Sequence, residues 1–314
     1  MASLLVTGGA GFIGANFVHL VRAQRPDTEV VVLDKLTYAG NRAHLDGLDR
    51  VTFVQGDVAD PDDVRRAFEA AGKGARVVHF AAESHVDRSI DSCAEFLSTN
   101  VVGTQVMLDV ARGYDVERFL HVSTDEVYGS LPDGAFADEQ AKLNPTNPYS
   151  ASKAASDHLV LAAVNTHGIP AVITRCSNNY GRFQFPEKFV PVMITRAMQG
   201  KPLPIYGDGL YVRDWIHVDD HGEAILAVLE CGETGTVYNV AGDNHRTNLD
   251  VARLILAAVG AAPDAMEHVQ DRPGHDRRYA PDDARIRDQL GWKPTRDFES
   301  ELAATVRWYG ERYA

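Results

Sequence analysis

The sequence predicts an α/β fold, with a Rossmann-like, doubly wound parallel sheet and a smaller α/β substrate-binding domain. Three observations lead to this prediction. Short apolar runs alternate with segments of helical spacing, which is typical of parallel strands joined by crossover helices. A glycine loop, Gly8-x-x-Gly11-x-x-Gly14, stands between the first run and the first such segment. After about Cys176 the loops lengthen and prolines recur, which indicates a second, smaller domain.

Each expected element follows from its own residues. Short apolar runs rich in Val, Leu and Phe predict strands buried on both faces, at Ser3–Thr7, Val30–Leu33, Val51–Val54, Val77–Phe80, Phe119–Val122 and Ala171–Thr174. Helical spacing predicts helices from the glycine loop to about Arg25 and over Asp62–Ala71, Glu95–Arg112, Ala151–Thr166 and Phe298–Tyr313.

The change of rhythm places a domain boundary near residue 176. We expect a dinucleotide-binding domain over residues 1–175 and a substrate-binding domain over residues 176–314. A segment near residues 213–240 is expected to return to the first sheet, beginning with the apolar Trp215–Val218. Since no polar linker separates the two halves, a cleft between packed lobes is the expected ligand site.

The composition limits the classes of partner. The chain has 314 residues and a formal net charge of −13, which argues against nucleic-acid binding because phosphates require clustered Lys and Arg. The spacing of Cys93, Cys176 and Cys231 suits neither a metal site nor a disulfide framework. No apolar run approaches the roughly 20 residues of a membrane span. We therefore expect a cytoplasmic protein without a metal or a membrane contact.

The glycine loop predicts a dinucleotide site because a strand precedes it, a helix follows it and a second strand comes next. Glycines there permit a tight turn and a close approach of the backbone to a pyrophosphate. Asp34 ends the second strand, where its carboxylate can accept hydrogen bonds from ribose hydroxyls and repel a 2′-phosphate. This favours NAD over NADP, a preference that the nearby Lys35 and Arg42 oppose.

Two more strands end in residues that suit a cofactor. Asp57 follows the third strand, where it can accept a hydrogen bond from an adenine amino group. Ala81 and Ala82 follow the fourth strand, and their small side chains allow a cofactor to pass close by. Both places are carboxyl ends of strands, where ligands bind in sheets of this kind.

Tyr149 and Lys153 form a candidate redox couple. They are four residues apart, so on a helix they share one face. A cationic Lys beside a phenol favours the phenolate and lowers its pKa from the usual value of about 10. The phenolate can take a proton from a sugar hydroxyl while hydride leaves for a nicotinamide. With the glycine loop and Ser123-Thr124, this couple resembles the extended short-chain dehydrogenase/reductase superfamily.

Within that superfamily, the strip Ser123-Thr124-Asp125-Glu126-Val127-Tyr128-Gly129 is similar to the signature of dTDP-glucose 4,6-dehydratases. Two adjacent carboxylates beside a redox site offer a general acid and a general base. Related sugar epimerases carry small residues at positions 125 and 126, whereas GDP-mannose dehydratases and UDP-glucuronate decarboxylases typically have Ser before the Glu. The resemblance runs from the first strand to about Trp292 and includes Asp34–Asn41, Ala81–Ser89, Arg175–Gly181 and Arg272–Ala280.

The resemblance implies a hydro-lyase that converts dTDP-glucose to dTDP-4-keto-6-deoxyglucose with NAD. The steps are oxidation at C4, loss of water across C5 and C6, and reduction at C6. Tyr149, beside Lys153, would take the C4 hydroxyl proton, and Thr124 would hold the C4 oxygen. Glu126 would be the base at C5, and Asp125 the acid that protonates the departing C6 hydroxyl. This division of roles requires Asp125 to be protonated and Glu126 to be ionised.

The resemblance also assigns contact residues. Besides Tyr149 and Lys153, NAD is expected to contact Gly8, Gly11, Phe12, Ile13, Gly14, Asp34, Lys35, Leu36, Thr37, Asp57, Val58, Ala81, Ala82, Ser84, Thr99 and Asn179. The nucleotide sugar is expected to contact Ser84, Thr124, Asn178, Glu187, Lys188, Phe189, Pro204, Tyr206, Arg213, Asn248, Arg272, His275 and Tyr279.

The same resemblance gives the two domains and the assembly their expected roles. Residues 1–175 would bind NAD and residues 176–314 the nucleotide sugar, with Arg213 and Arg272 on its diphosphate. The family forms homodimers through a four-helix bundle, to which Glu95–Arg112 and Ala151–Thr166 would contribute here.

Other functions remain open from the sequence. A UDP-glucose 4,6-dehydratase would use the same residues, and departures from the expected pattern at Arg182, Tyr211 and His245-Arg246 leave thymidine and uridine undecided. A related nucleotide-sugar epimerase or decarboxylase is disfavoured by the Asp125-Glu126 pair. A catalytically silent NAD-binding regulator is disfavoured because Tyr149, Lys153 and both acids are present.

Overall fold

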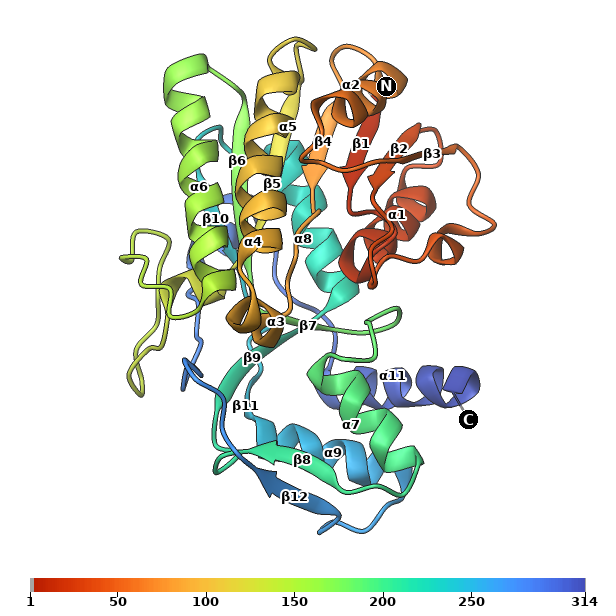
Figure 1. Ribbon diagram of the computed structural model, residues 1–314, viewed down its shortest axis with the longest axis vertical. Coiled ribbons are helices and arrows are strands. Elements are labelled where there is room, and N and C mark those ends of the chain that lie inside the picture. Colours follow the sequence, from red (N-terminus) through yellow and green to blue (C-terminus); the bar gives the residue numbers. More distant parts are fainter. Residues whose placement is uncertain (1–2, 314) are drawn as a thin grey trace.

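The computed structural model describes residues 3–313 (Figure 1). Seven parallel strands form the main sheet in the order β10-β6-β5-β4-β1-β2-β3. They are β1 (Leu4–Thr7), β2 (Val30–Asp34), β3 (Val51–Gln55), β4 (Arg76–His79), β5 (Arg118–Thr124), β6 (Ala171–Cys176) and β10 (Val237–Val240). The doubly wound parallel sheet expected from the alternating apolar runs is confirmed.

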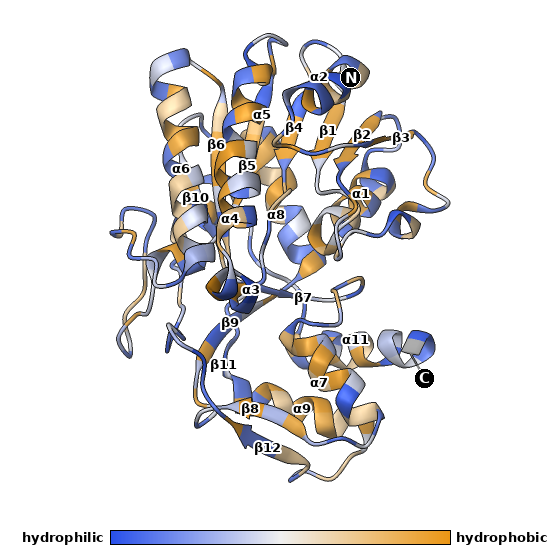
Figure 2. Cartoon of the chain, viewed as in Figure 1, coloured by the Kyte–Doolittle hydropathy of each residue, from blue (hydrophilic) through white to orange (hydrophobic). Residues whose placement is uncertain are grey.

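Helices cover both faces of this sheet, because the residues of each strand alternate between two cores. On β1, Leu4 and Val6 pack toward α1 (Phe12–Gln24), α8 (Val218–Cys231) and α10 (Ala284–Leu290). Leu5 packs on the opposite face, toward α2 (Pro61–Ala71), α5 (Thr104–Ala111) and α6 (Pro148–His167). Figure 2 shows hydrophobic residues along the strands between these two layers.

The helix expected over Glu95–Arg112 is not a single α-helix. The short helices α3 (Val86–Asp91) and α4 (Ala94–Phe96) lead into a π-helical stretch, η2 (Leu97–Gly103), and α5 follows. The buried Asn100 of this stretch bonds the backbone of Glu83 through its side chain, at 2.9 Å for both the accepted and the donated bond, and donates to the Ser152 hydroxyl at 2.8 Å. Within the π-helical stretch, the Asn100 side-chain amide thus bonds the helix to the loop after β4, at the carboxyl edge of the sheet.

The second half of the chain contributes two small sheets and a third core. The sheets have the orders β11-β9-β7 and β12-β8. The remaining elements are η1 (Arg42–Leu45), η3 (Asp125–Tyr128), β7 (Asn178–Tyr180), α7 (Phe189–Met198), β8 (Leu203–Tyr206), β9 (Val212–His217), β11 (His245–Thr247), α9 (Asn248–Val259), β12 (Met266–Val269) and α11 (Phe298–Tyr313). Apolar residues of α7, α9 and α11 form the core of this part.

The segment that returns to the main sheet differs in detail from the expectation. Trp215 lies in β9, which pairs with β7 and β11 and not with the main sheet. The chain then crosses through α8, which packs on α1, and β10 pairs with β6. We propose a domain boundary near residue 176. The elements α8 and β10 lie beyond it in the sequence but pack with the first domain.

Over residues 3–313, no helix combines the length and the apolar character needed to cross a bilayer. Within the same range, no group of three or more His, Cys, Asp or Glu side chains is arranged to hold a metal ion.

The glycine loop yields a stability prediction. A Cβ at Gly14 would lie 2.3 Å from the backbone oxygen of Gly8, which cannot move aside as a flexible side chain can. Gly14→Ala should therefore lower the free energy of unfolding by about 1–3 kcal/mol, the usual range for overpacking. Gly113→Ala is the matched control, because this exposed glycine has its nearest atom at 3.4 Å. Equal urea midpoints for the two variants, followed by circular dichroism, would contradict the close packing.

Candidate active site

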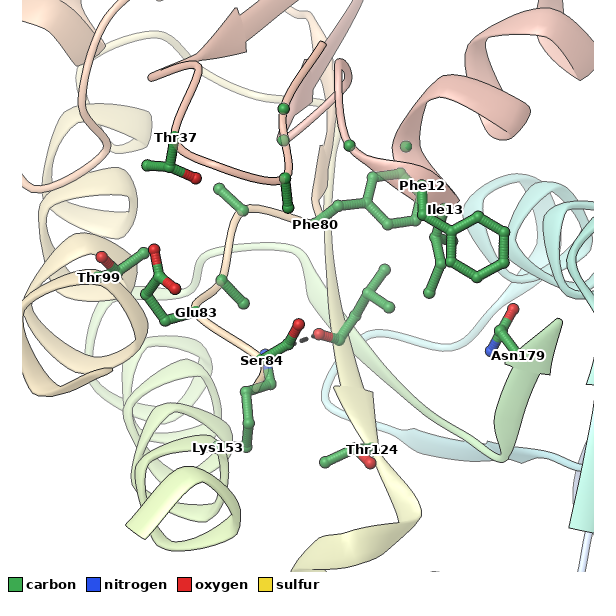
Figure 3. A pocket seen from close by; sticks show the side chains of 18 of the residues that line it. Phe12, Ile13, Thr37, Phe80, Glu83, Ser84, Thr99, Thr124, Lys153 and Asn179 are labelled. Carbon is green, nitrogen blue, oxygen red and sulfur yellow. Dashed lines mark hydrogen bonds between the residues drawn. The ribbon is translucent and has the colours of Figure 1, made fainter. Parts of the chain in front are cut away.

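A cavity of about 310 Å³ lies at the carboxyl edge of the main sheet. The strands are parallel, so β1, β2, β4 and β5 all end at this edge. Figure 3 shows Phe12 and Ile13 from the start of α1, Phe80 after β4 and Thr124 at the end of β5 around one space. Every residue expected to contact NAD lines this cavity except Leu36.

The glycine loop forms one wall of the cavity. Gly8 has φ of +68°, and a Cβ there would lie 2.8 Å from the backbone nitrogen of Ala81. At Gly14, the Gly8 backbone likewise leaves no space for a Cβ. Gly11 precedes the first residue of α1, so the free N–H groups of the helix start face the cavity wall. This backbone cradle fits a pyrophosphate.

Asp34 is fixed at the end of β2 by two backbone bonds. Its carboxylate accepts from Ala10 N at 2.9 Å and from Leu36 N at 2.8 Å. Burial raises the pKa of Asp34, and these two bonds together with the charge of His44 oppose that rise. Leu36 has φ of +57° and does not line the cavity, but its N–H donates to Asp34, which does. The contact between Leu36 and NAD stays a prediction.

The positive charge that opposes a preference for NAD is paired within the protein. Lys35 Nζ lies 2.7 Å from Asp57 Oδ2, while Asp57 Oδ1 accepts from Ala59 N at 2.9 Å. Because Asp57 pairs with the Lys35 ammonium, a negative charge already offsets the positive charge that would attract a 2′-phosphate.

The two carboxylates of the strip follow directly from β5, in the short helix η3. The Thr124 hydroxyl caps this helix by accepting from Glu126 N at 3.2 Å. Thr124 also donates to Asp125 Oδ1 at 3.4 Å, and Asp125 Oδ2 is buried without a hydrogen-bond partner among residues 3–313. Glu126 Oε2 accepts from the Tyr279 hydroxyl at 3.4 Å. Both carboxylates line the cavity.

Their surroundings separate the two carboxyl groups electrostatically. Burial raises the pKa of Asp125 well above its usual range, and the charges of Glu126 and Asp214 add to that rise. Burial also raises the pKa of Glu126, but three cations, Arg213, Arg272 and Lys188, oppose the rise. The surroundings thus favour protonation of Asp125 over protonation of Glu126.

Tyr149 and Lys153 lie on α6 and both line the cavity. Lys153 Nζ donates to the carbonyl oxygen of Val122 at 2.8 Å, and burial lowers the pKa of Lys153 to about 8 against the charge of Asp157. Burial and the charge of Glu126 raise the pKa of Tyr149 well above its usual range. The expected lowering by Lys153 is therefore not found, because burial and the carboxylates dominate at the phenol.

Only part of the expected sugar-binding set lines this cavity, namely Ser84, Thr124, Asn178 and Lys188. Lys188 reaches across from the start of α7 and donates to Ser84 O at 2.7 Å. The residues outside the lining are Glu187, Phe189, Pro204, Tyr206, Arg213, Asn248, Arg272, His275 and Tyr279.

Several residues of the outer set nevertheless face Glu126 from the second half of the chain. The Arg213 guanidinium lies 4.3 Å from the centre of the Tyr279 ring, whose hydroxyl is 2.7 Å from Asp276 Oδ2 and 3.4 Å from Glu126 Oε2 and can donate its one proton to either. Arg272 Nη1 lies 3.2 Å from Asp87 Oδ1. Both guanidinium groups act electrostatically on Glu126, and the Tyr279 phenol lies within 3.4 Å of it.

The rest of the outer set makes contacts with residues other than Asp125 and Glu126. Tyr206 in β8 lies 6.2 Å from His275 between ring centres, and Pro204 precedes it in the same strand. Asn248 begins α9. Phe189 packs on Trp215, with ring centres 5.8 Å apart. Glu187 Oε2 accepts from Arg88 Nη2 at 2.9 Å, and its Oε1 has no hydrogen-bond partner among the described residues.

The sequence did not point to several residues that line the cavity. They are Leu33, Ala39, Gly40, Gly56, Phe80, Glu83, Val122, Ser123, Cys176, Ser177, Gln184 and Phe185. Most of them are adjacent in the sequence to an expected residue at a strand end. This adjacency could have predicted that they line the cavity. Gln184 and Phe185 come from the loop before α7, where nothing in the sequence periodicity marks a ligand contact.

Comparison with known proteins gives consistent results. Residues 5–305 match the family model described as GDP-mannose 4,6 dehydratase. The dTDP-glucose 4,6-dehydratase of Streptomyces antibioticus is 50% identical, over 99% of this chain and 93% of the relative. That of Neisseria meningitidis serogroup B is 48% identical, over 98% of this chain and 93% of the relative.

Solved structures agree with these relatives. The dTDP-glucose 4,6-dehydratase DesIV from Streptomyces venezuelae, with NAD and TYD bound, has a TM-score of 0.94 and 47% identity, covering 99% of this chain and 97% of that one. The Thermus thermophilus UDP-glucose 4-epimerase in complex with NAD has a TM-score of 0.92 and 32% identity, covering 99% of both chains. The chain therefore belongs to the GDP-mannose 4,6 dehydratase family and, within it, to the dTDP-glucose 4,6-dehydratases.

Proposed function

We propose that this protein is an NAD-dependent hydro-lyase that converts dTDP-glucose to dTDP-4-keto-6-deoxyglucose. The observation that carries the proposal is the pair Asp125 and Glu126, which lines the same cavity as Tyr149, Lys153 and the glycine loop. Relatives named dTDP-glucose 4,6-dehydratases, nearly half identical over almost the whole chain, support it.

The cavity residues fit NAD. The backbone around Gly8 and Gly14 leaves no room for a Cβ, as close passage of a pyrophosphate requires, and Asp34 stands where ribose hydroxyls are bound in such folds. Bound NAD supplies a hydride acceptor for C4 of the sugar and a hydride donor for C6.

In the oxidation, we assign Tyr149 as the base at the C4 hydroxyl. Its phenolate takes the hydroxyl proton as the C4 hydride leaves, and the C4 ketone forms. Lys153 beside it carries the positive charge that favours a phenolate, which matters because burial opposes ionisation at this phenol. Thr124, at the end of β5, is placed to hydrogen-bond the C4 oxygen.

In the elimination, the C4 ketone acidifies the C5 hydrogen and Glu126 removes it as a proton. Asp125 gives its proton to the C6 hydroxyl, which departs as water, and a C5–C6 double bond remains. Hydride addition at C6 and protonation at C5 then give the product. The raised pKa of Asp125, caused first by burial, supports its role as the acid, and the cations around Glu126 support its role as the base.

We further propose that the second half of the chain binds the nucleotide diphosphate. Arg213 and Arg272 offer forked donors that suit phosphate oxygens, and both act on Glu126 electrostatically, so they lie near the reacting sugar. Pro204 and Tyr206 of β8 are proposed to flank the base. UDP-glucose would fit the same arrangement, whereas an epimerase has no step that uses two adjacent carboxyl groups.

We also propose a homodimer in the cytoplasm. The segment Leu97–Ala111 lies beside α6 at the edge of the main sheet (Figure 1). Leu97 and Val102 there are 49% and 51% exposed, and a partner's equivalent helices would cover them. Helices of this length also serve as ordinary sheet cover, so the oligomeric state is a matter for measurement.

The first test of the function uses mass spectrometry of the products. Incubation with dTDP-glucose should give a sugar nucleotide lighter by one water, with no net consumption of NAD, because each hydride removed at C4 returns at C6. UDP-glucose is the matched substrate, and we expect the thymidine nucleotide to react faster. An unchanged mass with an inverted sugar stereocentre would instead identify an epimerase.

The second test separates the two carboxyl groups. Glu126→Gln and Asp125→Asn should each slow product formation by about 10²–10⁴-fold, the usual contribution of a general base or acid. In D₂O, only Asp125→Asn should still place deuterium at C5 of recovered substrate, because its base is intact. Asp133→Asn, in an exposed loop, is the control. C5 exchange in Glu126→Gln but not in Asp125→Asn would reverse the two roles.

The third test concerns the dimer. Sedimentation velocity should give a mass of twice the 34.3 kDa of the chain. Placing charges on the exposed apolar positions, with Leu97→Glu and Val102→Glu together, should convert the dimer to monomers. Phe136→Glu is the control, because Phe136 is as exposed but lies in the loop after η3. Dissociation by the control alone, or by neither variant, would count against these helices as the interface.

A further inference from the structure

A chain of buried polar side chains lies beneath Lys153, on the side away from the cavity. It runs from Lys153 through His121 and Asp157 to Arg175, and none of these side chains is more than 4% exposed. Of these four residues, only Lys153 has a role in the proposed reaction. Buried polar groups are costly unless they are paired, so the arrangement calls for a physical account.

His121 Nε2 is the centre of the group. It lies 3.4 Å from Lys153 Nζ, 3.1 Å from Ser156 Oγ and 3.6 Å from Asp157 Oδ1. Ser156 Oγ lies 2.8 Å from the Lys153 carbonyl oxygen and 3.1 Å from Nε2, so its single hydroxyl proton can be donated to a bare Nε2. An ammonium has donors only, and a bare Nε2 is therefore the form of His121 that can bond a charged Lys153.

His121 cannot pass a proton onward. Burial and the neighbouring positive charges, that of Lys153 first among them, hold its pKa well below the usual value, so the ring is neutral. Its other nitrogen, Nδ1, is buried with no hydrogen-bond partner among the described residues. A proton that arrived at the ring would have no exit, so the group acts through position and charge and not as a proton wire.

Asp157 supplies the negative charge of the group. Its Oδ2 accepts from Arg175 Nε at 2.9 Å, and Arg175 Nη1 donates to the Tyr128 hydroxyl at 2.9 Å. Asp157 Oδ1 has no partner closer than His121 Nε2. Burial lowers the pKa of Lys153, and the charge of Asp157 opposes that lowering, which leaves it at about 8.

We propose that His121 and Asp157 are positioning residues for Lys153, with His121 as a second acceptor for its ammonium and Asp157 as its buried counter-charge. Together with the Val122 carbonyl oxygen, they hold the ammonium one helical turn along α6 from Tyr149. The titratable groups around Lys153 are Tyr149 and Asp157 on its own helix, His121 on β5, His79 on β4, and Arg175 and Cys176 on β6.

The proposal rests on the redox role proposed for Lys153 and predicts a pH dependence. The ammonium is lost as the pH rises through about 8, so kcat should fall on the alkaline side from that pH. Without the Nε2 acceptor the charged form is less stable, and the alkaline limb should move to lower pH by about one unit. KM for the nucleotide sugar should stay within about twofold, because His121 lies outside the cavity lining.

The test compares His121→Gln with His121→Asn. The Gln amide oxygen can reach the place of Nε2, whereas Asn is one bond shorter and cannot bond Lys153. His121→Gln should keep the alkaline limb, and His121→Asn should shift it and lower kcat at pH 7.5 by about threefold, as a one-unit shift from about pH 8 requires. His79→Asn controls for loss of a buried imidazole, because His79 pairs with His121 across β4 and β5 but bonds Thr7 and Thr104 instead.

If the alkaline limb of kcat lies at the same pH in His121→Asn and His79→Asn, the proposal is overturned. It is also overturned if the limb shifts as far in His121→Gln as in His121→Asn. If His121→Asn does not fold, Asp157→Asn provides the second variant and should shift the limb in the same direction. The wild-type rate on dTDP-glucose is the reference for every ratio. Its absence would count against the proposed function, whereas a normal rate with an unmoved limb would count against His121 and Asp157 alone.

Discussion

The burial of Asp125 next to Glu126 is the constraint on which the rest of the site depends. Two adjacent buried carboxyl groups repel each other when both are charged, so one of them is protonated more readily than the other. The difference is set from outside the pair. Asp214 and burial favour protonation of Asp125, whereas Arg213, Arg272 and Lys188 favour the charge on Glu126. The charged residues that separate the pKa values of these two carboxyl groups, Asp214, Arg213, Arg272 and Lys188, all belong to the second half of the chain.

The redox couple of Tyr149 and Lys153 also depends on groups outside the couple. Lys153 must keep a positive charge in a dry interior, and the groups that stabilise it lie on the neighbouring strand and one turn along its own helix. The parallel sheet makes both arrangements possible, because it brings the ends of β1, β2, β4 and β5 to one edge, where the cofactor loop, the acids and Tyr149 meet.

Much of this was predictable from the sequence, since apolar runs and glycine spacing act locally. The strands, the dinucleotide loop and the strip from Ser123 to Gly129 needed no tertiary information. What depends on tertiary contacts was not predictable. The raised pKa of Tyr149 follows from burial and from Glu126. The place of Trp215 in a separate sheet follows from the pairing of its strand with β7 and β11.

The central claim is that oxidation, elimination and reduction occur on one sugar held in this cavity. Its most direct test is to supply dTDP-glucose with deuterium at C4 and to locate the label in the product by NMR. The account predicts deuterium at C6 within the same molecule, even when unlabelled dTDP-glucose is mixed in. Loss of the label to solvent, or its appearance in products from unlabelled molecules, would contradict it.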